Sequence, residues 1–347
     1  MMSSSGESSG SCRRYLRLFV PVFFLIAVVA GATVFAADVS VRITEWDLSE
    51  GTFPHDPAVA PDGALWYTGM QSNTIGMVDP KTGKIREYKI PTPDSGPHGL
   101  VADAGGNIWF TANFKGYIGR LDPKTGVFRE YPMPDPAARD PHTPVFDGRG
   151  MLWFTVQGGN AVGRLDPASG LIRLRKMMAE GSRPYGIVVN SKGIPFFCEF
   201  GRNRLASIDP ETMEITEYPL PEGSRPRRIA ITPDDRVYYT DFARGRIGWL
   251  DAKTGETGDF PSPGGKGSAP YGMAATSDGV VWYSESGVNP NTIVRFDPKT
   301  KTFTSWTVPS GGGVVRHMVA TPGGDLYIAC SGKDKVGTVA VSRAASQ

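Results

Sequence analysis

One stretch of the chain recurs seven times, and this repetition limits the fold more than any other feature of the sequence. The clearest copy, residues 96–134, reads GPHGLVADAGGNIWFTANFKGYIGRLDPKTGVFREYPMP. We take the residue after proline in Pro-His-Gly as the anchor of each copy; neighbouring anchors lie roughly 42–45 residues apart, a period typical of four-stranded propeller blades. The seven anchors are His55, His98, His142, Tyr185, Arg227, Tyr271 and Arg316.

Each copy has the pattern of four short strands. A first strand follows the anchor, a Gly-containing turn such as Gly105-Gly106 follows it, and a Trp-Phe-Thr segment marks the second strand. The third strand reads Ile-Gly-Arg-Leu-Asp, and the turn Asp-Pro-Lys-Thr-Gly leads to a fourth strand with apolar–polar alternation. The sequence therefore predicts an all-β fold, a seven-bladed β-propeller with four strands in each blade.

The last copy is incomplete, and the beginning of the domain supplies the missing part. After the third strand near residues 336–341 the chain contains no fourth strand, whereas residues 41–48 match a fourth strand without the three that should precede it. We expect this N-terminal strand to complete the last blade, because a closed ring leaves no open sheet edge. The predicted propeller domain spans residues 37–347.

Residues 1–36 have the features of a signal peptide. An uncharged run over residues 18–37 follows three arginines, Arg13, Arg14 and Arg17. Val34 and Ala36 have the size and spacing that a signal peptidase recognises, which predicts cleavage after Ala36. The run is also long enough to span a bilayer, so an uncleaved anchor is the alternative. Cleavage would place the domain in the periplasm or outside the cell.

The predicted mature chain has no net formal charge, because the segment removed carries the whole excess of two positive charges. A neutral domain lacks the basic surface that nucleic acids or anionic lipids require, so neither is expected as a partner. Cys198 and Cys330 occupy different positions in their repeats, which argues against a disulfide between them. We expect both to be buried thiols.

Two positions vary in polarity between the repeats and are candidates for a binding site. The first is the anchor. The second lies fourteen residues later, at the end of the second strand, where the chain has Gly69, Ala112, Val156, Glu199, Asp241, Glu285 and Cys330. Because the first two strands of a blade are antiparallel neighbours, both positions should lie at one mouth of the central channel.

The histidines and the acidic residues fall in different blades at these positions. Blades one to three have His55, His98 and His142 as anchors, while blades four to six pair Tyr185 with Glu199, Arg227 with Asp241 and Tyr271 with Glu285. Blade seven pairs Arg316 with Cys330. One interpretation is a polar ligand-binding pocket with histidines on one wall and carboxylates on the other. The alternative is structural: these side chains hydrogen-bond neighbouring blades, and Arg227 with Asp241 forms an ion pair.

Three neutral imidazoles at one mouth also form a candidate metal site. His55, His98 and His142 would suit zinc or another first-row ion, with water or a carboxylate as the fourth ligand. The sequence contains no short-range motif such as His-x-x-x-His, so this site depends on the blades bringing the three side chains together.

The segments Gly-Pro-His-Gly-Leu (96–100), Ile-Trp-Phe-Thr (108–111) and Phe-Arg-Glu-Tyr-Pro-Met-Pro (128–134) resemble the repeats of the virginiamycin B lyase family, the streptogramin lyases. The resemblance implies a propeller that opens the ester ring of type B streptogramins by elimination, with a magnesium ion. It also implies catalytic histidines at the last two anchors and a glutamate at the end of the second strand of the last blade. This chain has Tyr271, Arg316 and Cys330 there. His317 is one residue after the anchor and, in a regular strand, would point to the other side.

The sequence therefore leaves two functions open. The first is a lyase or hydrolase that acts on a cyclic ester or lactone at the channel mouth, with His98, His142 and Glu285 as catalytic residues and a divalent metal, magnesium by resemblance or zinc by ligand type. The second is a non-catalytic periplasmic propeller that binds a small ligand or a partner protein. In either case we expect a monomer.

Overall fold

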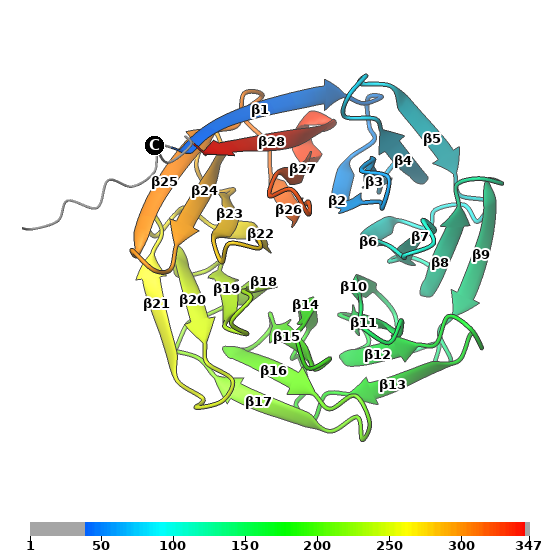
Figure 1. Cartoon of the computed structure of the whole chain (residues 1–347). Helices are drawn as coiled ribbons and strands as arrows, with labels where there is room; N and C mark the ends of the chain where they lie inside the picture. The colour runs from blue at the N-terminus through cyan, green and yellow to red at the C-terminus, as the bar shows by residue number, and fades with distance from the viewer. Residues whose placement is uncertain (1–38, 344–347) are drawn as a thin grey trace, which may run out of the picture. The chain divides into compact units, whose positions relative to one another are not determined.

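The computed structural model describes residues 39–343, and these form a ring of seven four-stranded antiparallel sheets (Figure 1). The predicted seven-bladed propeller is confirmed. The predicted signal peptide, residues 1–36, lies outside the described residues, so its cleavage stays a prediction. Within the described range, no helix is both long and apolar enough to cross a membrane.

The first six blades each follow the chain from the innermost strand to the outermost. Their strands are β2 (Pro54–Val59), β3 (Leu65–Gly69), β4 (Thr74–Val78), β5 (Ile85–Lys89); β6 (Pro97–Ala102), β7 (Ile108–Ala112), β8 (Tyr117–Asp122), β9 (Val127–Pro132); β10 (Pro141–Phe146), β11 (Leu152–Val156), β12 (Ala161–Leu165), β13 (Ile172–Lys176); β14 (Pro184–Val189), β15 (Pro195–Glu199), β16 (Arg204–Ile208), β17 (Ile215–Pro219); β18 (Pro226–Ile231), β19 (Val237–Asp241), β20 (Arg246–Leu250), β21 (Thr257–Pro261); β22 (Pro270–Ala275), β23 (Val281–Glu285), β24 (Thr292–Asp297) and β25 (Thr302–Thr307).

The seventh blade joins the two ends of the domain. It contains β26 (Val315–Ala320), β27 (Leu326–Cys330), β28 (Lys335–Arg343) and β1 (Val39–Asp47), with one 3-10 turn at Ser331–Lys333. The N-terminal strand β1 pairs with β28 along its whole length, from Val39 opposite Arg343 to Asp47 opposite Lys335. The predicted completion of the last blade is confirmed.

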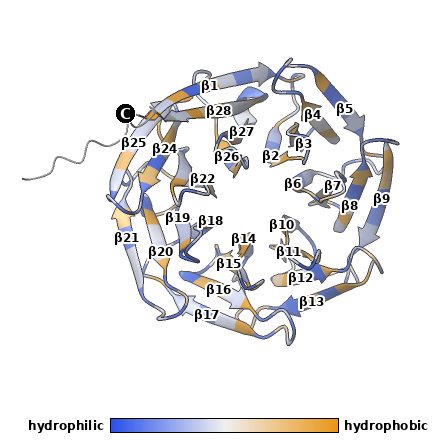
Figure 2. Cartoon of the chain, in the orientation of Figure 1, coloured by the Kyte–Doolittle hydropathy of each residue, from blue (hydrophilic) through white to orange (hydrophobic). Residues whose placement is uncertain are grey.

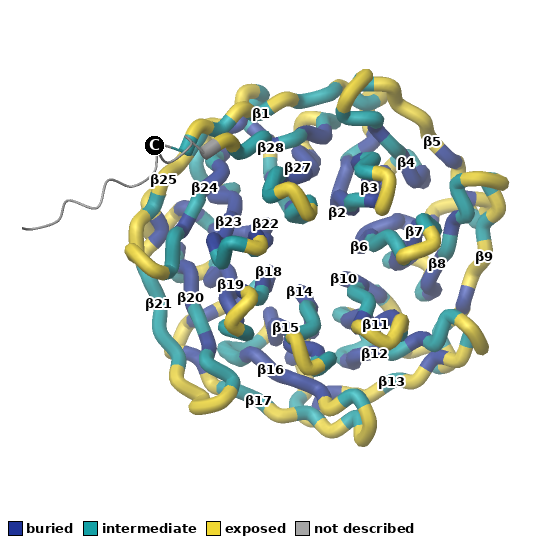
Figure 3. Tube along the Cα trace, viewed as in Figure 1, coloured by how far each residue is buried: buried dark blue, intermediate teal, exposed yellow. Residues whose placement is uncertain are grey.

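The core lies between the blades, and the outer strands face solvent on one side. Trp109, Trp153 and Trp282, from the second strands, are among the largest fully buried side chains. The inner strands are mostly buried and the outermost ones mix buried, intermediate and exposed positions, in line with their alternating hydropathy (Figures 2 and 3). Cys198 and Cys330 are buried and unpaired, as expected.

The glycine of Ile-Gly-Arg-Leu-Asp allows an aromatic ring of the second strand to lie flat over the third. A Cβ atom on Gly119 would lie 2.1 Å from the Phe110 ring. The same close approach recurs in other blades, at Gly76 with Tyr67, Gly163 with Phe154 and Gly248 with Tyr239. A side chain at these positions would displace the ring from the core.

We expect Gly119→Ala to lower the free energy of unfolding by about 2 kcal/mol, because the added methyl group overpacks the site. Gly148→Ala is the matched control, since no atom lies within 4 Å of its added Cβ. Urea denaturation of both variants measures the difference. Equal stabilities of the two variants would show that the Phe110 ring moves aside without cost.

Candidate functional site

A β-bulge at the start of each inner strand positions the anchors. In blade two, Pro97 pairs with Ala112 and the next pair is Leu100 with Phe110, so His98 and Gly99 lie outside the regular ladder. The same shift occurs in all seven blades. A bulge changes the direction of side chains and is common beside functional sites.

In five blades a hydroxyl at the Trp-Phe-Thr threonine position holds the bulge and links it to the next blade; it comes from Thr68, Thr111, Thr155, Thr240 and Ser284. Blades four and seven have Cys198 and Ala329 there. Thr111 Oγ1 accepts a hydrogen bond from the Gly99 N–H at 2.8 Å and donates one to the His142 carbonyl oxygen at 2.7 Å. Thr68 likewise donates to the His98 carbonyl oxygen at 2.9 Å. The backbone of each of these anchors is thus held by the preceding blade.

The anchors meet at one mouth of the channel, as the repeat alignment predicts. The imidazole rings of His55 and His98 lie 3.7 Å apart between centroids, and those of His98 and His142 3.8 Å apart. The Tyr185 ring follows at 3.9 Å from His142, and its hydroxyl lies 2.5 Å from that of Tyr271. All seven anchors line one cavity of about 270 Å³, which we call the anchor mouth: His55, His98, His142, Tyr185, Arg227, Tyr271 and Arg316.

The acidic residues at the ends of the second strands do not join the anchors. Glu285 accepts hydrogen bonds from the Gly264 N–H at 2.6 Å and the Thr292 hydroxyl at 2.7 Å. Asp241 forms an ion pair with Arg244 and not with Arg227. Glu199 is buried beside Ser182, and burial raises its pKa. None of these three carboxylates lines the anchor mouth, so the expected wall of carboxylates opposite the histidines is not formed by them.

A second ring of polar residues, which the sequence reasoning missed, lies directly beneath the anchors. Arg228 Nη2 and Asp56 Oδ1 form an ion pair at 2.6 Å across the channel, and Arg228 Nη1 donates to Thr143 Oγ1 at 3.0 Å. Asp56 also contacts His55 Nδ1 at 2.9 Å. We call Asp56, Thr143, Arg228 and His317 the polar layer. The sequence does contain a sign of this layer, because each of the four residues occupies the position of the glycine in the repeated Pro-X-Gly.

Burial keeps the histidines neutral. It lowers the pKa of His55 to about 4, although the hydrogen bond that His55 donates to the Asp56 carboxylate acts in the opposite direction. Burial also lowers the pKa of His98 and His142 well below the ordinary value, and nearby positive charge adds to the effect at His142. For Asp56 burial alone would raise the pKa, but Arg228, His317 and His55 outweigh it and hold the pKa well below its usual range.

The anchor mouth contains one carboxyl group suited to proton transfer, Asp140, which the sequence reasoning also missed. It precedes the strand that carries His142 and receives a hydrogen bond from the Asn113 amide; both residues line the cavity. Burial raises the pKa of Asp140 to about 6, against the opposing effects of Asn113 and Arg183. A carboxyl group with this pKa can act as a base near neutral pH. It lies outside the repeated positions, where comparing repeats could not find it.

Two arginines give the mouth a positive character. The guanidinium of Arg227 lies 3.7 Å from the centroid of the Tyr271 ring and 4.4 Å from that of Phe242. Arg316 lies 5.1 Å from the Phe53 ring. The buried Nε atoms of both arginines have no hydrogen-bond partner among residues 39–343. Both side chains line the anchor mouth, so their guanidinium groups can bind an oxygen atom of a ligand there.

The residues of the mouth fit some metal ions better than others. His55, Asp56 and His98 have one potential ligand atom each within 4.8 Å of one another, whereas the predicted third histidine, His142, is not in this group. Asp56 Oδ2 and His98 Nδ1 have no hydrogen-bond partner in the described part of the chain. Two imidazoles and one carboxylate suit zinc by donor type. Magnesium, which prefers several oxygen ligands, does not fit.

Comparison with known proteins gives one consistent result. The model of the virginiamycin B lyase family matches residues 29–199 and 172–346. A streptogramin B lyase structure is 28% identical with a TM-score of 0.80, covering 87% of this chain and 98% of that one. Selenomethionine-substituted virginiamycin B lyase from Staphylococcus aureus is 27% identical with a TM-score of 0.78, covering 86% and 99%.

Two further findings complete the comparison. A catalytically inactive histidine-to-alanine variant of the Staphylococcus aureus lyase, solved with quinupristin, is 26% identical with a TM-score of 0.79, covering 86% of this chain and 99% of that one. No curated protein sequence matches the chain.

Proposed function

The chain belongs to the virginiamycin B lyase family, and from this premise we propose that it opens a cyclic ester or lactone at the anchor mouth. One observation carries the proposal. The anchor mouth combines a carboxyl group with a pKa of about 6, Asp140, and two arginines that line the same cavity, Arg227 and Arg316. An elimination needs both a base and a positive group to hold the charge that develops.

The proposed reaction is an elimination with Asp140 as the base. Its carboxylate removes the proton on the carbon next to a carbonyl group, and Arg227 stabilises the negative charge that develops on the carbonyl oxygen. The electron pair then forms a carbon–carbon double bond as the carbon–oxygen bond of the ester breaks. The departing carboxylate is held by Arg316. This assignment differs from the predicted set, because Glu285 is engaged in the blade.

His98 and His142 remain candidates for a supporting catalytic role. Their low pKa values make the imidazoles weak bases, but a neutral imidazole can hydrogen-bond a carbonyl or hydroxyl of the substrate. A zinc-like ion held by His55, Asp56 and His98 would supply Lewis-acid polarisation of the substrate. Elemental analysis of the protein purified without chelator tests this ion, and Asp56→Asn and His98→Ala should abolish binding if it is present.

We expect Asp140→Asn to reduce turnover of a cyclic ester or lactone about a hundredfold, because the amide cannot accept the proton. In the parent protein, activity should rise as the pH increases through about 6, where the Asp140 carboxyl group ionises. Asp135→Asn, at a half-buried position of the same connection that does not line the anchor mouth, is the control.

The test is a panel of cyclic esters and lactones followed by mass spectrometry, with added magnesium, zinc or calcium. Elimination leaves the total mass of the substrate unchanged, whereas hydrolysis adds one water. Full activity in Asp140→Asn would rule out its role as the base. No turnover of any member of the panel would count heavily against an enzyme of this kind.

A second function is supported by the placement of the predicted carboxylates. Because Glu199, Asp241 and Glu285 lie outside the mouth, the pocket could bind a ligand without reacting with it, as a periplasmic binding propeller. Binding of an ester without turnover, lost in Arg227→Ala, would support this alternative. Capture of a periplasmic protein that survives simultaneous alanine substitution of His98, His142 and Glu285 would instead place a partner interface away from the mouth. Export itself stays a prediction that N-terminal sequencing of the mature protein can test.

A further inference from the structure

A second cavity lies beyond the polar layer, on the opposite side from the anchor mouth. Its volume is about 390 Å³, which falls within the roughly 300–1,000 Å³ typical of small-molecule sites. The inner strands of all seven blades contribute to it: β2, β6, β10, β14, β18, β22 and β26. We call it the apolar tunnel.

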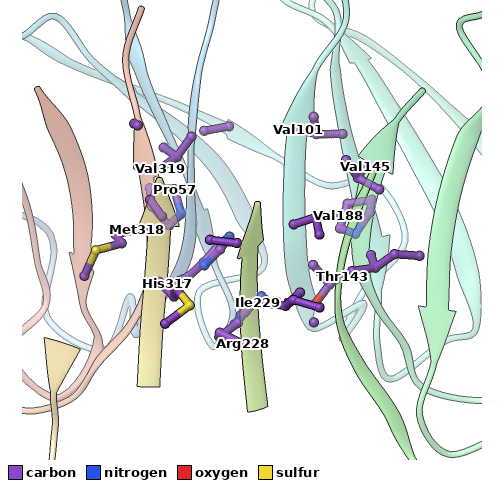
Figure 4. A pocket seen from close by; sticks show the side chains of 18 of the residues that line it. Pro57, Val101, Thr143, Val145, Val188, Arg228, Ile229, His317, Met318 and Val319 are labelled. Carbon is purple, nitrogen blue, oxygen red and sulfur yellow. Dashed lines mark hydrogen bonds between the residues drawn. The ribbon is translucent and has the colours of Figure 1, made fainter. Parts of the chain in front are cut away.

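The walls of the apolar tunnel are aliphatic. Figure 4 shows Val101, Val145, Val188 and Val319, from four different blades, on the same side of Arg228 and His317. Each of these valines is only half-buried, so it has free surface. These side chains offer apolar surface to a ligand, and burying it is favourable. Each inner strand is also the free edge of its sheet, so backbone N–H and C=O groups face the channel beside the valines.

The floor of the tunnel is polar but carries little net charge. Arg228, Thr143 and His317 line it, and Arg228 is neutralised by Asp56 at 2.6 Å. Arg228 is 1% exposed, and its Nε–H has no hydrogen-bond partner within residues 39–343; the same holds for Nδ1 of His317. A buried donor without a partner is costly, so an oxygen atom of a ligand placed there would be favoured.

We propose that the apolar tunnel binds a small molecule with an aliphatic body and one uncharged hydroxyl or carbonyl group at its end. The aliphatic body contacts the valine walls, and the oxygen accepts a hydrogen bond from Arg228 Nε–H. His317 Nδ1 forms a hydrogen bond with the same hydroxyl or carbonyl group. A cationic end is disfavoured by the guanidinium. An anionic end gains less than it would at a free arginine, because Asp56 already balances the charge.

This site is separate from the anchor mouth and does not depend on the proposed lyase activity. The polar layer lies between the two cavities, since Asp56 contacts His55 on one side while Arg228 lines the tunnel on the other. A ligand in the tunnel therefore does not touch Asp140, Arg227 or Arg316. Failure of one proposal leaves the other standing.

Isothermal titration calorimetry with the purified protein tests the site with four probes: 1-hexanol, 1-heptanol, 1-octanol and octyltrimethylammonium. We expect the alcohols to bind with affinity that rises about fourfold for each added methylene group, the gain expected for burying it. Octyltrimethylammonium should bind at least tenfold more weakly than 1-octanol. Absence of binding by all three alcohols, or affinity that does not change with chain length, would overturn the proposal.

Three variants locate the binding. Val188→Trp should fill part of the tunnel and weaken the binding of 1-octanol at least tenfold. His317→Phe keeps an aromatic ring but removes Nδ1, and it should weaken the binding of 1-octanol about fivefold. Arg316→Ala, at the anchor mouth, should bind 1-octanol as the parent does. Circular dichroism confirms that each variant is folded. Unchanged binding in both folded tunnel variants, or loss of binding in Arg316→Ala, would place the alcohol elsewhere and overturn the assignment.

Discussion

Asp56→Asn is expected to lower the free energy of unfolding by about 4 kcal/mol, because it leaves the charge of Arg228 buried without a partner. Both side chains are 1% exposed, and their atoms lie 2.6 Å apart across the channel. The ion pair joins blades one and five, which have no shared strand. The cost reflects the uncompensated guanidinium, so it should appear in urea denaturation at pH 7 as a lower transition midpoint.

Two further variants separate this cause from a general weakness of the blade. Asp62→Asn, in an exposed turn of the same blade, should change stability by less than about 0.5 kcal/mol. Combining Asp56→Asn with Arg228→Met removes the unpaired charge and should restore most of the loss. If the double variant is as unstable as Asp56→Asn, the guanidinium is not the origin of the effect.

Stability is also expected to fall steeply as the pH decreases from about 6 to about 4.5. His55, His98 and His142 are buried, and in the folded state their pKa values lie well below the value of about 6.5 of an unfolded histidine. In this range the unfolded chain binds protons that the folded chain does not. Each of these histidines, and also His317 with its pKa lowered to about 3, therefore contributes about 1.4 kcal/mol per pH unit. Asp140, whose pKa is raised to about 6, opposes them by about as much as one histidine, so the net slope is about 4 kcal/mol per pH unit.

The direction of the effect follows from the lowered pKa values: stability rises with pH through this window and levels off above about 7. Urea denaturation at several pH values, in buffer with a chelator so that no metal binds, gives the slope. His98→Gln should reduce it by about a third, since one titrating group is removed. A stability that does not vary between pH 6 and pH 4.5 would mean that the histidines take up protons in the folded ring.

The repeat made the fold predictable, because a pattern that recurs seven times with fixed turns and strand lengths has few arrangements. It also located the anchors at one mouth, including His55, His98 and His142. The expectation that successive side chains of a strand point to opposite sides is wrong for the residue that follows the anchor. It predicts that His317, next to the anchor Arg316, points away from the channel, but the β-bulge aims both positions inward. The bulge also explains why Asp56 and Arg228 can meet.

The carboxylates were misplaced for a related reason. Glu285 lies at the same end of its blade as the anchor, but its side chain belongs to the packing between neighbouring segments and meets Gly264 and Thr292. A residue can lie at the same end of its blade as the anchor while its side chain does not reach the channel axis. Asp140 and Asn113 reach the mouth from positions outside the two rings that were compared, so the repeat alignment could not identify them.

The pairing of β1 with β28 has a consequence for how the protein is made. These two strands are at opposite ends of the domain, so the first strand to be synthesised bonds with the last. At roughly 5–20 residues per second, synthesis keeps β1 without its partner for about tens of seconds. The ring can therefore close only when synthesis of the chain is complete, and until then at most six blades can stack. Late closure is compatible with the predicted export, because a channel that passes unfolded chains requires a domain that has not yet closed.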